Sequence, residues 1–392
     1  MSFKLASRLD GISESATLKL NAMVQAMRAQ KMDVINFTAG EPDFYVPEEA
    51  KLAAIQAVNE NKSKYTPVGG IPELREAIAA KTNAQQGLGW KASQVCVSNG
   101  GKQAIFNSFM ALLNPGDEVI VPAPYWLSYP EIVKLCGAKP IFIDAPSSQR
   151  FKITPDQLKS ALNLKTRLFI INSPSNPTGV MYSCEELQAL GEVLKTHPHV
   201  WILSDEIYDR IQFGEVPFTS FLAACPWLSD RTITANGMSK SASMTGWRVG
   251  WSVAPDSLTQ GILTLQGQST SGINAPAQWA SLAALKLPES AFASNIDAFR
   301  RRRNLALEIL KKARKMEVVS PDGAFYFFLG IGGLALSDSF AFAEKVLEEA
   351  KVAVVPGAPF GNSKAVRISF ATDDRSLQDG CERLVRFVES IS

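Results

Sequence analysis

Lys240 has the surroundings that most favour chemistry. It lies among small and hydroxyl residues, between Asn236 and Ser241, directly after an apolar run that is typical of a buried strand. An amine withdrawn from water in such a place has a depressed pKa and can form a Schiff base with a carbonyl compound. Because most lysines are solvated surface charges, Lys240 taken alone is only a candidate nucleophile.

Asp205 is the matching candidate acid. It follows the apolar run from Val200 to Ser204, and open parallel sheets bind ligands at the carboxyl ends of their strands. A buried carboxylate at that edge needs a cationic partner, for which a protonated ring nitrogen is suited. The alternative is an ordinary helix N-cap before Glu206.

Further polar segments follow other strands at the same edge. The loop from Asn172 to Gly179 is fixed by two prolines and offers the amide of Asn176 to a cleft. The segment from Ser98 to Lys102 joins a strand to a helix, so its backbone N–H groups and the helix dipole can receive a phosphate. Ser239 and Arg248 would add a hydroxyl and a guanidinium to the same anion.

Trp126 and Arg367 each have two interpretations. Trp126 is either an ordinary core tryptophan or a side chain that covers the face of an aromatic cofactor. Arg367 alternates with Val366 and Ile368 on a short strand. It is either a surface charge, which the pattern alone favours, or a bidentate clamp for a carboxylate.

The elements that must position these residues form an α/β pattern. Seven short, mostly apolar runs alternate with helical patterns, which predicts a mainly parallel seven-stranded sheet with helices on both faces. The strands are expected at residues 94–97, 118–121, 139–143, 168–171, 200–204, 232–235 and 248–253, and the helices at 102–113, 126–135, 155–161 and 184–195.

A smaller α+β unit is expected after about residue 285. Its predicted elements are a long charged helix at 291–315, strands at 323–328 and 365–370, and a helix at 339–350. The first 45 residues, with a helical pattern at 17–30, are expected to pack on that unit. We therefore predict a large domain of residues 46–285 and a small domain of residues 1–45 with 286–392. The basic run Arg300 to Arg303 is interpreted as a solvated helix face.

Composition narrows the class of protein. The chain has 392 residues, of which 46% are hydrophobic and 20% charged, with a net charge of +2. This excludes a disordered chain and disfavours binding to nucleic acid or to an anionic membrane. Without a signal peptide pattern or a long apolar segment, a cytoplasmic location is expected.

Metal and triad chemistry have few residues to draw on. Five scattered cysteines without CxxC spacing argue against a disulfide framework and a zinc site, so buried thiols and no metal are expected. Two histidines, which flank one proline, leave little for a Ser-His-Asp triad. Acid–base chemistry must therefore come from Lys, Tyr, Asp or Glu.

The motifs together resemble the class I and II aminotransferases of fold type I, which use pyridoxal 5′-phosphate, and in particular the bacterial aspartate aminotransferases. The resemblance covers nearly the whole chain, and its motifs come in the family's order. They lie at residues 39–44, 65–70, 99–102, 173–179, 205–208, 239–250 and 367–369.

The resemblance implies a role for each of these residues. Lys240 would form an aldimine with the cofactor and then carry a proton in a ping-pong transfer, with Asp205 and Tyr208 completing the catalytic set. The implied cofactor-binding residues are Gly100, Gly101, Lys102, Trp126, Asn176, Asp205, Tyr208, Ser239, Lys240 and Arg248, with Tyr65 reaching across the interface of a homodimer. The implied substrate-binding residues are Gly40, Lys102, Trp126, Asn176, Arg367 and Thr17.

The substrate is expected to be an L-amino acid, with aspartate or glutamate favoured. In the family subgroup with a lysine at the position of Lys102, that side chain receives the distal carboxylate. The chain departs from the pattern at Ser13, Tyr45 and Val46, which keeps open an aromatic, prephenate or alanine-type aminotransferase.

Other proteins of this fold remain as rivals. A β-lyase would keep the same cofactor residues and differ only in which Cα bond is aligned with the ring. A transcription regulator with a domain of this type is disfavoured, because few residues precede position 39 and the net charge is near neutral. A catalytically silent binding protein is disfavoured by the presence of both Lys240 and Asp205.

Overall fold

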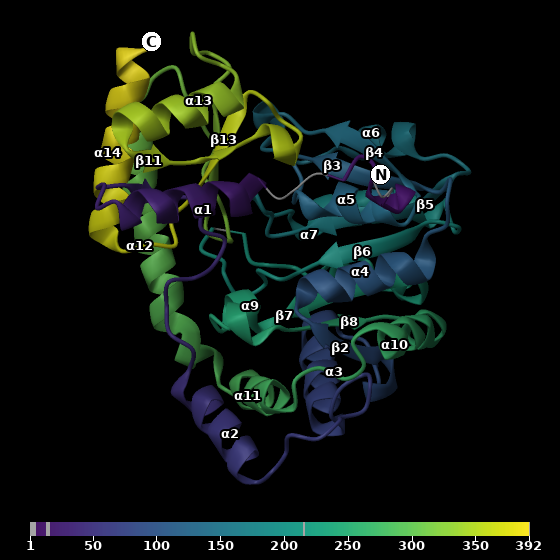
Figure 1. Cartoon of the computed structure of the whole chain (residues 1–392). Helices are drawn as coiled ribbons and strands as arrows, with labels where there is room; N and C mark the ends of the chain where they lie inside the picture. The colour runs from purple at the N-terminus through teal and green to yellow at the C-terminus, as the bar shows by residue number, and fades with distance from the viewer. Residues whose placement is uncertain (1–4, 13–15, 215, 392) are drawn as a thin grey trace.

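A seven-stranded sheet forms the larger part of the molecule (Figure 1). The structure is a computed structural model that describes residues 5–12, 16–214 and 216–391. The strand order is β2-β8-β7-β6-β5-β3-β4, with β8 antiparallel to both neighbours and the other pairs parallel. The strands are β2 (Val95–Asn99), β3 (Glu118–Ala123), β4 (Lys139–Asp144), β5 (Thr166–Asn172), β6 (Trp201–Asp205), β7 (Thr232–Gly237) and β8 (Val249–Val253). The predicted mainly parallel sheet is confirmed, and each predicted strand end lies within two residues of the observed one.

Both faces of this sheet are covered. Along β5, Leu168 and Ile170 join one apolar core, whereas Phe169 and Ile171 join the other. The first core is closed by α4 (Gly101–Leu112), α5 (Ser128–Leu135) and α10 (Asp256–Ser269). The second is closed by α2 (Glu48–Asn59), α3 (Pro72–Gln86), α6 (Pro155–Ala161), α7 (Cys184–Lys195), α8 (Phe221–Ala224) and α11 (Ala275–Leu285). Because side chains alternate across a strand, continuous apolar runs feed both cores.

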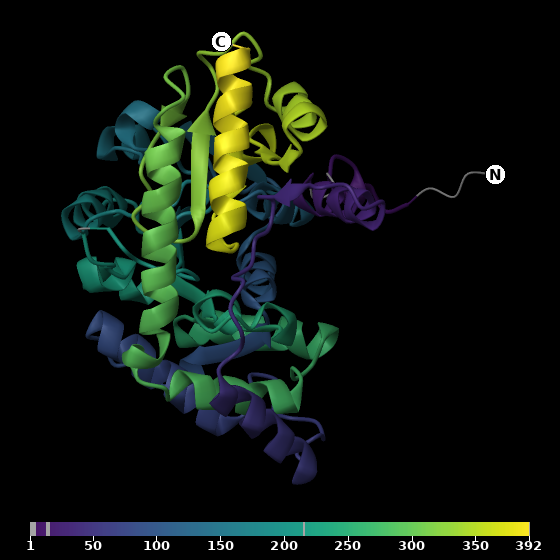
Figure 2. The same ribbon diagram turned by 90° about the vertical axis from the view of Figure 1, so that its left-hand side faces the viewer.

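A second group of elements stands beside the sheet. It contains the antiparallel sheet β12-β13-β10-β9 and the parallel pair of β1 and β11. Figure 2 shows two of its helices, α12 and α14, side by side. Its elements are α1 (Ala16–Ala29), β1 (Ile35–Asn36), α12 (Ala293–Leu310), β9 (Glu317–Val318), β10 (Tyr326–Gly330), α13 (Ser339–Lys345), β11 (Val352–Ala353), β12 (Val355–Pro356), β13 (Ala365–Ser369) and α14 (Asp374–Ser390).

The end of the N-terminal segment packs with this second group. Ile35 pairs with Val352, and Phe37 is buried in the same core as Phe299 and Leu384. Residues 7–11 instead lie against α5 of the predicted large domain, where Lys134 Nζ donates to the Gly11 carbonyl oxygen at 3.4 Å. The domain limits of 1–45 with 286–392 stay a prediction.

One prediction about this group is wrong. The arginine run on α12 is not a uniformly solvated face, because Arg302 is only 6% exposed. Its guanidinium forms ion pairs with Asp43 and Asp374, whereas Arg300 and Arg301 are exposed. The sequence of the run could not reveal this, since both carboxylates are distant in the chain.

The described residues contain neither a membrane-spanning helix nor a cluster of metal ligands. Among the described residues, no helix has the length and apolarity needed to cross a membrane. Within the same residues, no group of three or more His, Cys, Asp and Glu side chains could hold a metal ion. All five cysteines are free thiols, and Cys184 is the one that is only partly buried.

Candidate active site

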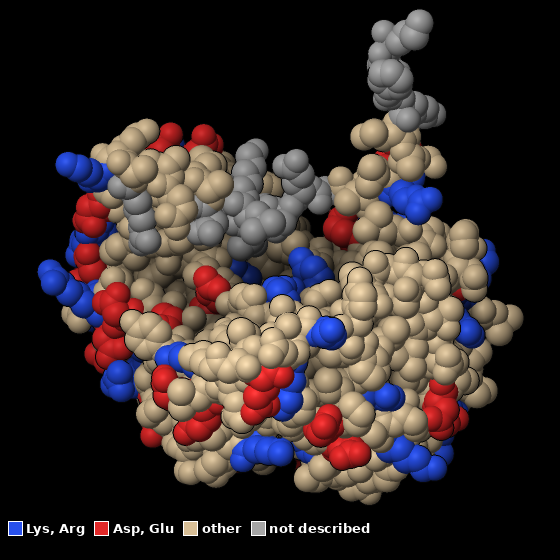
Figure 3. All heavy atoms as spheres, turned by 60° about the horizontal axis from the view of Figure 1, so that its bottom comes forward, with Lys and Arg blue, Asp and Glu red and all other residues tan. Residues whose placement is uncertain are grey.

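The carboxyl ends of the central strands open into a cavity of about 600 Å³. Figure 3 shows this face hollowed, with Lys and Arg atoms visible inside the hollow. β5 and β6 end in register, with Asn172 opposite Asp205, so two predicted motifs meet at one edge. The predicted site residues that line the cavity are Gly40, Gly101, Lys102, Trp126, Asn176, Asp205, Tyr208, Ser239, Lys240, Arg248 and Arg367.

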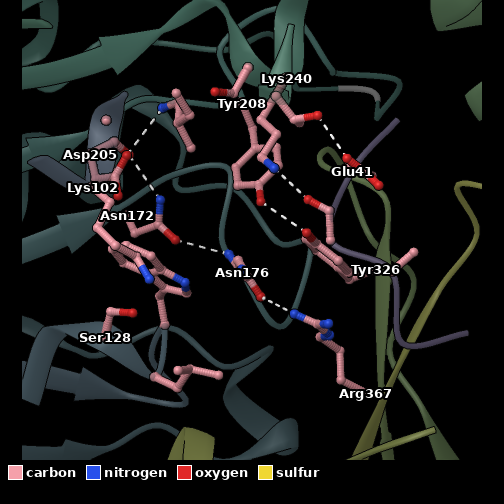
Figure 4. Close-up of a pocket in the computed structure, with 18 of the residues that line it drawn as sticks. Glu41, Lys102, Ser128, Asn172, Asn176, Asp205, Tyr208, Lys240, Tyr326 and Arg367 are labelled. Carbon is pink, nitrogen blue, oxygen red and sulfur yellow. Dashed lines mark hydrogen bonds between the residues drawn. The ribbon is translucent and has the colours of Figure 1, made fainter. Parts of the chain in front are cut away.

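Lys240 projects into this cavity from α9 (Met238–Ser241), a short helix that directly follows β7 (Figure 4). Its Nζ donates a hydrogen bond to the carbonyl oxygen of Gly40. Burial lowers the pKa of Lys240 to about 8, although the nearby Glu41 carboxylate opposes this and the Arg367 guanidinium assists it. A substantial neutral fraction therefore exists near pH 8, which is what a nucleophilic or basic amine requires.

Asp205 lies at the end of β6 and is 5% exposed. The Tyr129 hydroxyl donates to its Oδ2 at 2.6 Å, and the Ile207 backbone N–H donates to its Oδ1 at 3.2 Å. Burial raises the pKa of Asp205 to about 6, and these two donors oppose the rise. The alternative of a helix N-cap is wrong, because residues 207–210 form a turn and no helix directly follows Asp205.

Arg367 is buried, so the surface charge that its strand pattern alone favoured is wrong. Its Nη1 donates to Asn176 Oδ1 at 3.1 Å and its Nη2 to the Thr38 carbonyl oxygen at 2.9 Å. The guanidinium also lies 4.5 Å from the ring centroid of Tyr326. Its buried Nε has no hydrogen-bond partner among the described residues. A cation held by neutral oxygens, with an unused donor, is suited to a carboxylate ligand.

Tyr208 lies beside this arginine. Its hydroxyl is 3.0 Å from the hydroxyl of Tyr326, and burial raises the pKa of Tyr208 well above its usual value. Tyr208 is therefore a neutral phenol at physiological pH, able to donate a hydrogen bond to a ligand oxygen.

The opposite end of the cavity gathers donors for an anion. α4 begins at Gly101, and its N-terminal N–H groups and dipole favour negative charge. The Arg248 guanidinium is held by the carbonyl oxygens of Thr245 and Asn99, at 3.0 and 3.2 Å. Gly100 does not line the cavity, but a Cβ there would lie 2.6 Å from Arg248 Nη2. Glycine at position 100 thus makes room for the arginine.

Lys102 and Trp126 form one wall. The Nζ of Lys102 lies 5.2 Å from the Trp126 ring centroid. Burial first, and then the neighbouring Arg248, lower the pKa of Lys102. Trp126 precedes α5, which begins at Ser128 and so starts later than predicted. Its ring meets that of Tyr129 edge-on at 5.2 Å.

The residues of the cavity fit pyridoxal 5′-phosphate by their chemistry. The anion end has the donors that a phosphate requires, and Lys240 is an amine with a lowered pKa. Asp205 is a buried carboxylate without an ion-pair partner in the described part of the chain, as a site for a cationic ring nitrogen would need.

Comparison with known proteins identifies the family. The chain matches the family Aminotransferase class I and II over residues 32–384. It belongs to that family. An aspartate/prephenate aminotransferase of Cereibacter sphaeroides is 44% identical over 397 residues, which cover 99% of both chains. The aspartate aminotransferase of Bacillus subtilis is 42% identical, covering 99% of this chain and 100% of its own.

Solved aminotransferase structures share the whole fold. The aspartate aminotransferase from Rhizobium meliloti superposes with a TM-score of 0.95 at 39% identity, covering 100% of each chain. The Thermus thermophilus aspartate aminotransferase with maleate gives 0.93 at 39% identity, covering 98% of this chain and 100% of its own. The chain is therefore an aminotransferase with the fold type I architecture.

Two of the predicted site residues whose side chains or backbone are described, Gly100 and Tyr65, do not line the cavity. Tyr65 is 99% exposed, so its role across a subunit interface stays a prediction. Thr17 lies in α1, but its side chain is outside the described residues.

Thr38, Tyr129 and Tyr326 bond Arg367, Asp205 and Tyr208, respectively, but no sequence motif predicted them as site residues. The position of Tyr129, three residues after Trp126, was the signal that could have indicated it. Tyr326 could not be predicted, because its place in the site depends on the register of β10 with β13, which the sequence does not reveal.

Proposed function

We propose that the chain is a pyridoxal 5′-phosphate-dependent aminotransferase that acts on aspartate or glutamate and their 2-oxo acids. The observation that carries the proposal is the meeting of Lys240, Asp205, Arg367 and Lys102 in one cavity, with none of them in an ion pair among the described residues. Asp205 and Arg367 are buried, Lys240 is partly buried and Lys102 is exposed. Uncompensated buried charge is costly, and ligands of opposite charge would remove that cost.

Each side chain has a task suited to its surroundings. When bound, the cofactor supplies an aldehyde carbon for the amino group and a ring that accepts electrons. The phosphate would be held by the Gly101 and Lys102 backbone, Ser239 and Arg248. Trp126 would cover the ring.

Four residues would set the protonation state of the cofactor or move the substrate proton. Asp205 would keep the ring nitrogen protonated, and Tyr208 with Asn176 would donate to the ring oxygen. Lys240 would take the proton from Cα of the amino acid and deliver it to C4′, the former aldehyde carbon of the cofactor, since its amine is readily neutral near pH 8.

Two cations in the cavity favour a dicarboxylate substrate. Arg367, with the Gly40 backbone, would bind the α-carboxylate and so orient the Cα–H bond. Lys102 would receive the second carboxylate, and Thr17 would assist from α1. The structural relative from Thermus thermophilus was solved with maleate, which is also a dicarboxylate. Prephenate is a second candidate acceptor, because the Cereibacter sphaeroides relative is named for both substrates and prephenate also has two carboxylates.

A homodimer is part of the proposal. Leu52, Ile55 and Val58 on α2 are each 56% exposed, and Tyr65 is almost fully exposed nearby in the chain. Such an apolar surface favours an interface, through which Tyr65 would reach the partner's phosphate site. Sedimentation of the purified protein tests the dimer, and Tyr65→Phe with weaker cofactor retention tests the shared site.

The deciding experiment is an absorbance titration of the purified holoenzyme. Aspartate and glutamate should convert the bound cofactor to its pyridoxamine form, while phenylalanine and alanine do so more weakly. Lys102→Gln should raise the aspartate KM about thirtyfold, because a hydrogen-bonded ion pair is lost. It should change alanine kinetics little.

Other outcomes would redirect the assignment. Lys240→Ala should retain no lysine-bound chromophore. A wild-type protein without any bound chromophore would contradict the cofactor assignment. With an amino acid that has a sulfur leaving group on Cβ, release of ammonia, pyruvate and a thiol instead of amino transfer would identify a lyase.

A further inference from the structure

The segment of residues 38–44, between β1 and α2, lines one side of the cavity and is bonded to several separate elements. The Thr38 carbonyl oxygen accepts from Arg367 on β13. The Gly40 carbonyl oxygen accepts from Lys240 on α9. We call residues 38–44 the strap. The inner half of the strap therefore contacts both Arg367, the residue predicted to bind the substrate carboxylate, and Lys240, the predicted nucleophile.

The middle of the strap is tied to the anion end of the cavity. The Thr245 hydroxyl donates to Glu41 Oε2 at 2.7 Å. Thr245 also holds Arg248 through its carbonyl oxygen. Figure 4 shows Glu41 close to Lys240. A displacement of the strap would consequently move its contacts with the Lys240 amine and, through Thr245, with Arg248 at the same time.

The outer half of the strap is fixed by Arg302. Its Nη1 and Nη2 donate to the two carboxylate oxygens of Asp43, at 2.7 and 2.8 Å. Its Nε donates to Asp374 on α14 at 3.0 Å, and the Arg302 side chain is 8% exposed. Phe44 packs edge-on against Phe299 at 5.0 Å. The bidentate pair fixes both the position and the orientation of Asp43.

We propose that Arg302 and Asp43 are positioning residues that hold the strap in register, so that Gly40 and Glu41 meet Lys240 and the substrate carboxylate correctly. Neither residue touches the reacting atoms. The inference rests on the proposed function for its kinetic readout, but not for its structural one. Asp43 is bonded to Arg302 of α12, and Arg302 is in turn bonded to Asp374 of α14, so the position of the strap depends on both helices.

The kinetic test compares matched variants of the holoenzyme. Asp43→Asn keeps the shape of the side chain and removes the bidentate ion pair. Arg302→Lys keeps the charge and removes the planar fork. Each should raise the KM for aspartate about tenfold while kcat changes less than about threefold, because a displaced strap weakens the contact of the Gly40 backbone with the substrate carboxylate in the ground state and the transition state alike. The control is Arg301→Gln on the same helix, whose side chain is 61% exposed and also bonds Asp374.

A second readout does not depend on turnover. Hydrogen exchange of the backbone amides of residues 38–44 should accelerate in Asp43→Asn and Arg302→Lys, but not in Arg301→Gln. The absorbance pH titration of the lysine-bound cofactor should also move in the first two variants, because Glu41 would shift relative to Lys240.

The opposite result has a clear form. If Asp43→Asn lowers the melting temperature but leaves the KM, the amide exchange and the absorbance titration at wild-type values, the ion pair has only a structural role and the proposal is overturned. Failure of the proposed function is distinguishable, because wild-type protein would then lack the chromophore or the amino transfer while the exchange difference persisted.

Discussion

Two buried arginines mark two different regions of the molecule. Arg302, behind the cavity, is bonded to the carboxylates of Asp43 and Asp374. Arg367, inside the cavity, is bonded to neutral oxygens, and burial lowers its pKa. The chain itself compensates the first charge. The second has no ion-pair partner among the described residues, which is the condition that a carboxylate-binding arginine would require.

Two buried aspartates repeat the contrast with the opposite sign. Asp209 forms an ion pair with Lys81 and accepts from Gln85 at 2.9 Å. Burial alone would raise the pKa of Asp209, but Lys81 outweighs it and the pKa is lowered. Asp205 has only hydrogen bonds, and its pKa is raised. Thus Arg367 and Asp205, inside the cavity, have no ion-pair partner among the described residues, whereas Arg302 and Asp209, outside it, are both paired.

The largest expected effect concerns Arg367. Arg367→Gln should lower kcat/KM for aspartate about a thousandfold, since two charge-assisted hydrogen bonds to the α-carboxylate are lost. The melting temperature of the cofactor-free protein should stay the same or rise, because an uncompensated buried cation is removed. Steady-state kinetics and calorimetry on the same preparation measure both. A large fall in the melting temperature would show that Arg367, like Arg302, stabilises the fold, and would contradict the comparison of the two arginines.

The next effect compares the two aspartates by stability. Asp205→Asn should stabilise the cofactor-free protein by about 3 kcal/mol at pH 7, because a pKa raised from 3.8 to about 6 corresponds to that cost for the carboxylate. The gain should shrink as the pH falls through 6 and vanish near 4, where Asp205 is protonated in both states. Urea unfolding at several pH values measures it.

Asp209→Asn is the matched control for that series. It should destabilise the protein by about 2 kcal/mol, since the partly buried Lys81 loses its partner. A lowered pKa stabilises the folded state above the unfolded value and is lost only as the pH falls through the folded value. The deficit should therefore remain constant from pH 7 to pH 4.5. Parallel pH profiles for the two variants would contradict the comparison.

The smallest effect concerns the donor behind Asp205. Tyr129→Phe should weaken cofactor retention about tenfold, because the carboxylate loses one of its two hydrogen bonds and its pKa rises further. Tyr182→Phe is the control, because the Tyr182 hydroxyl is equally buried but accepts from the Ile153 backbone N–H instead. Fluorescence titration of the cofactor measures both. Equal weakening in the two variants would assign the effect to general packing.

The sequence predicts the sheet well because its strands are continuous apolar runs such as 168–171. It does not reveal α2 and α3, whose buried faces depend on small residues such as Ala50, Ala54 and Ala79 among charged ones. In the site, Lys240 and Asp205 are recognisable because each follows a strand. The Arg302–Asp43 pair spans 259 positions and Tyr129–Asp205 spans 76, and no local pattern encodes such contacts.

The antiparallel strand β8 restricts which amino acid can occupy position 250. Gly250 on β8 lies so close to the start of α4 that a Cβ would stand 2.2 Å from the Gly101 backbone nitrogen and 2.4 Å from the Gly100 carbonyl carbon. Backbone atoms cannot yield as a flexible side chain can. Among all codons introduced at position 250, selection for amino transfer should therefore return glycine alone, which makes this position a fixed point in any library built on this chain.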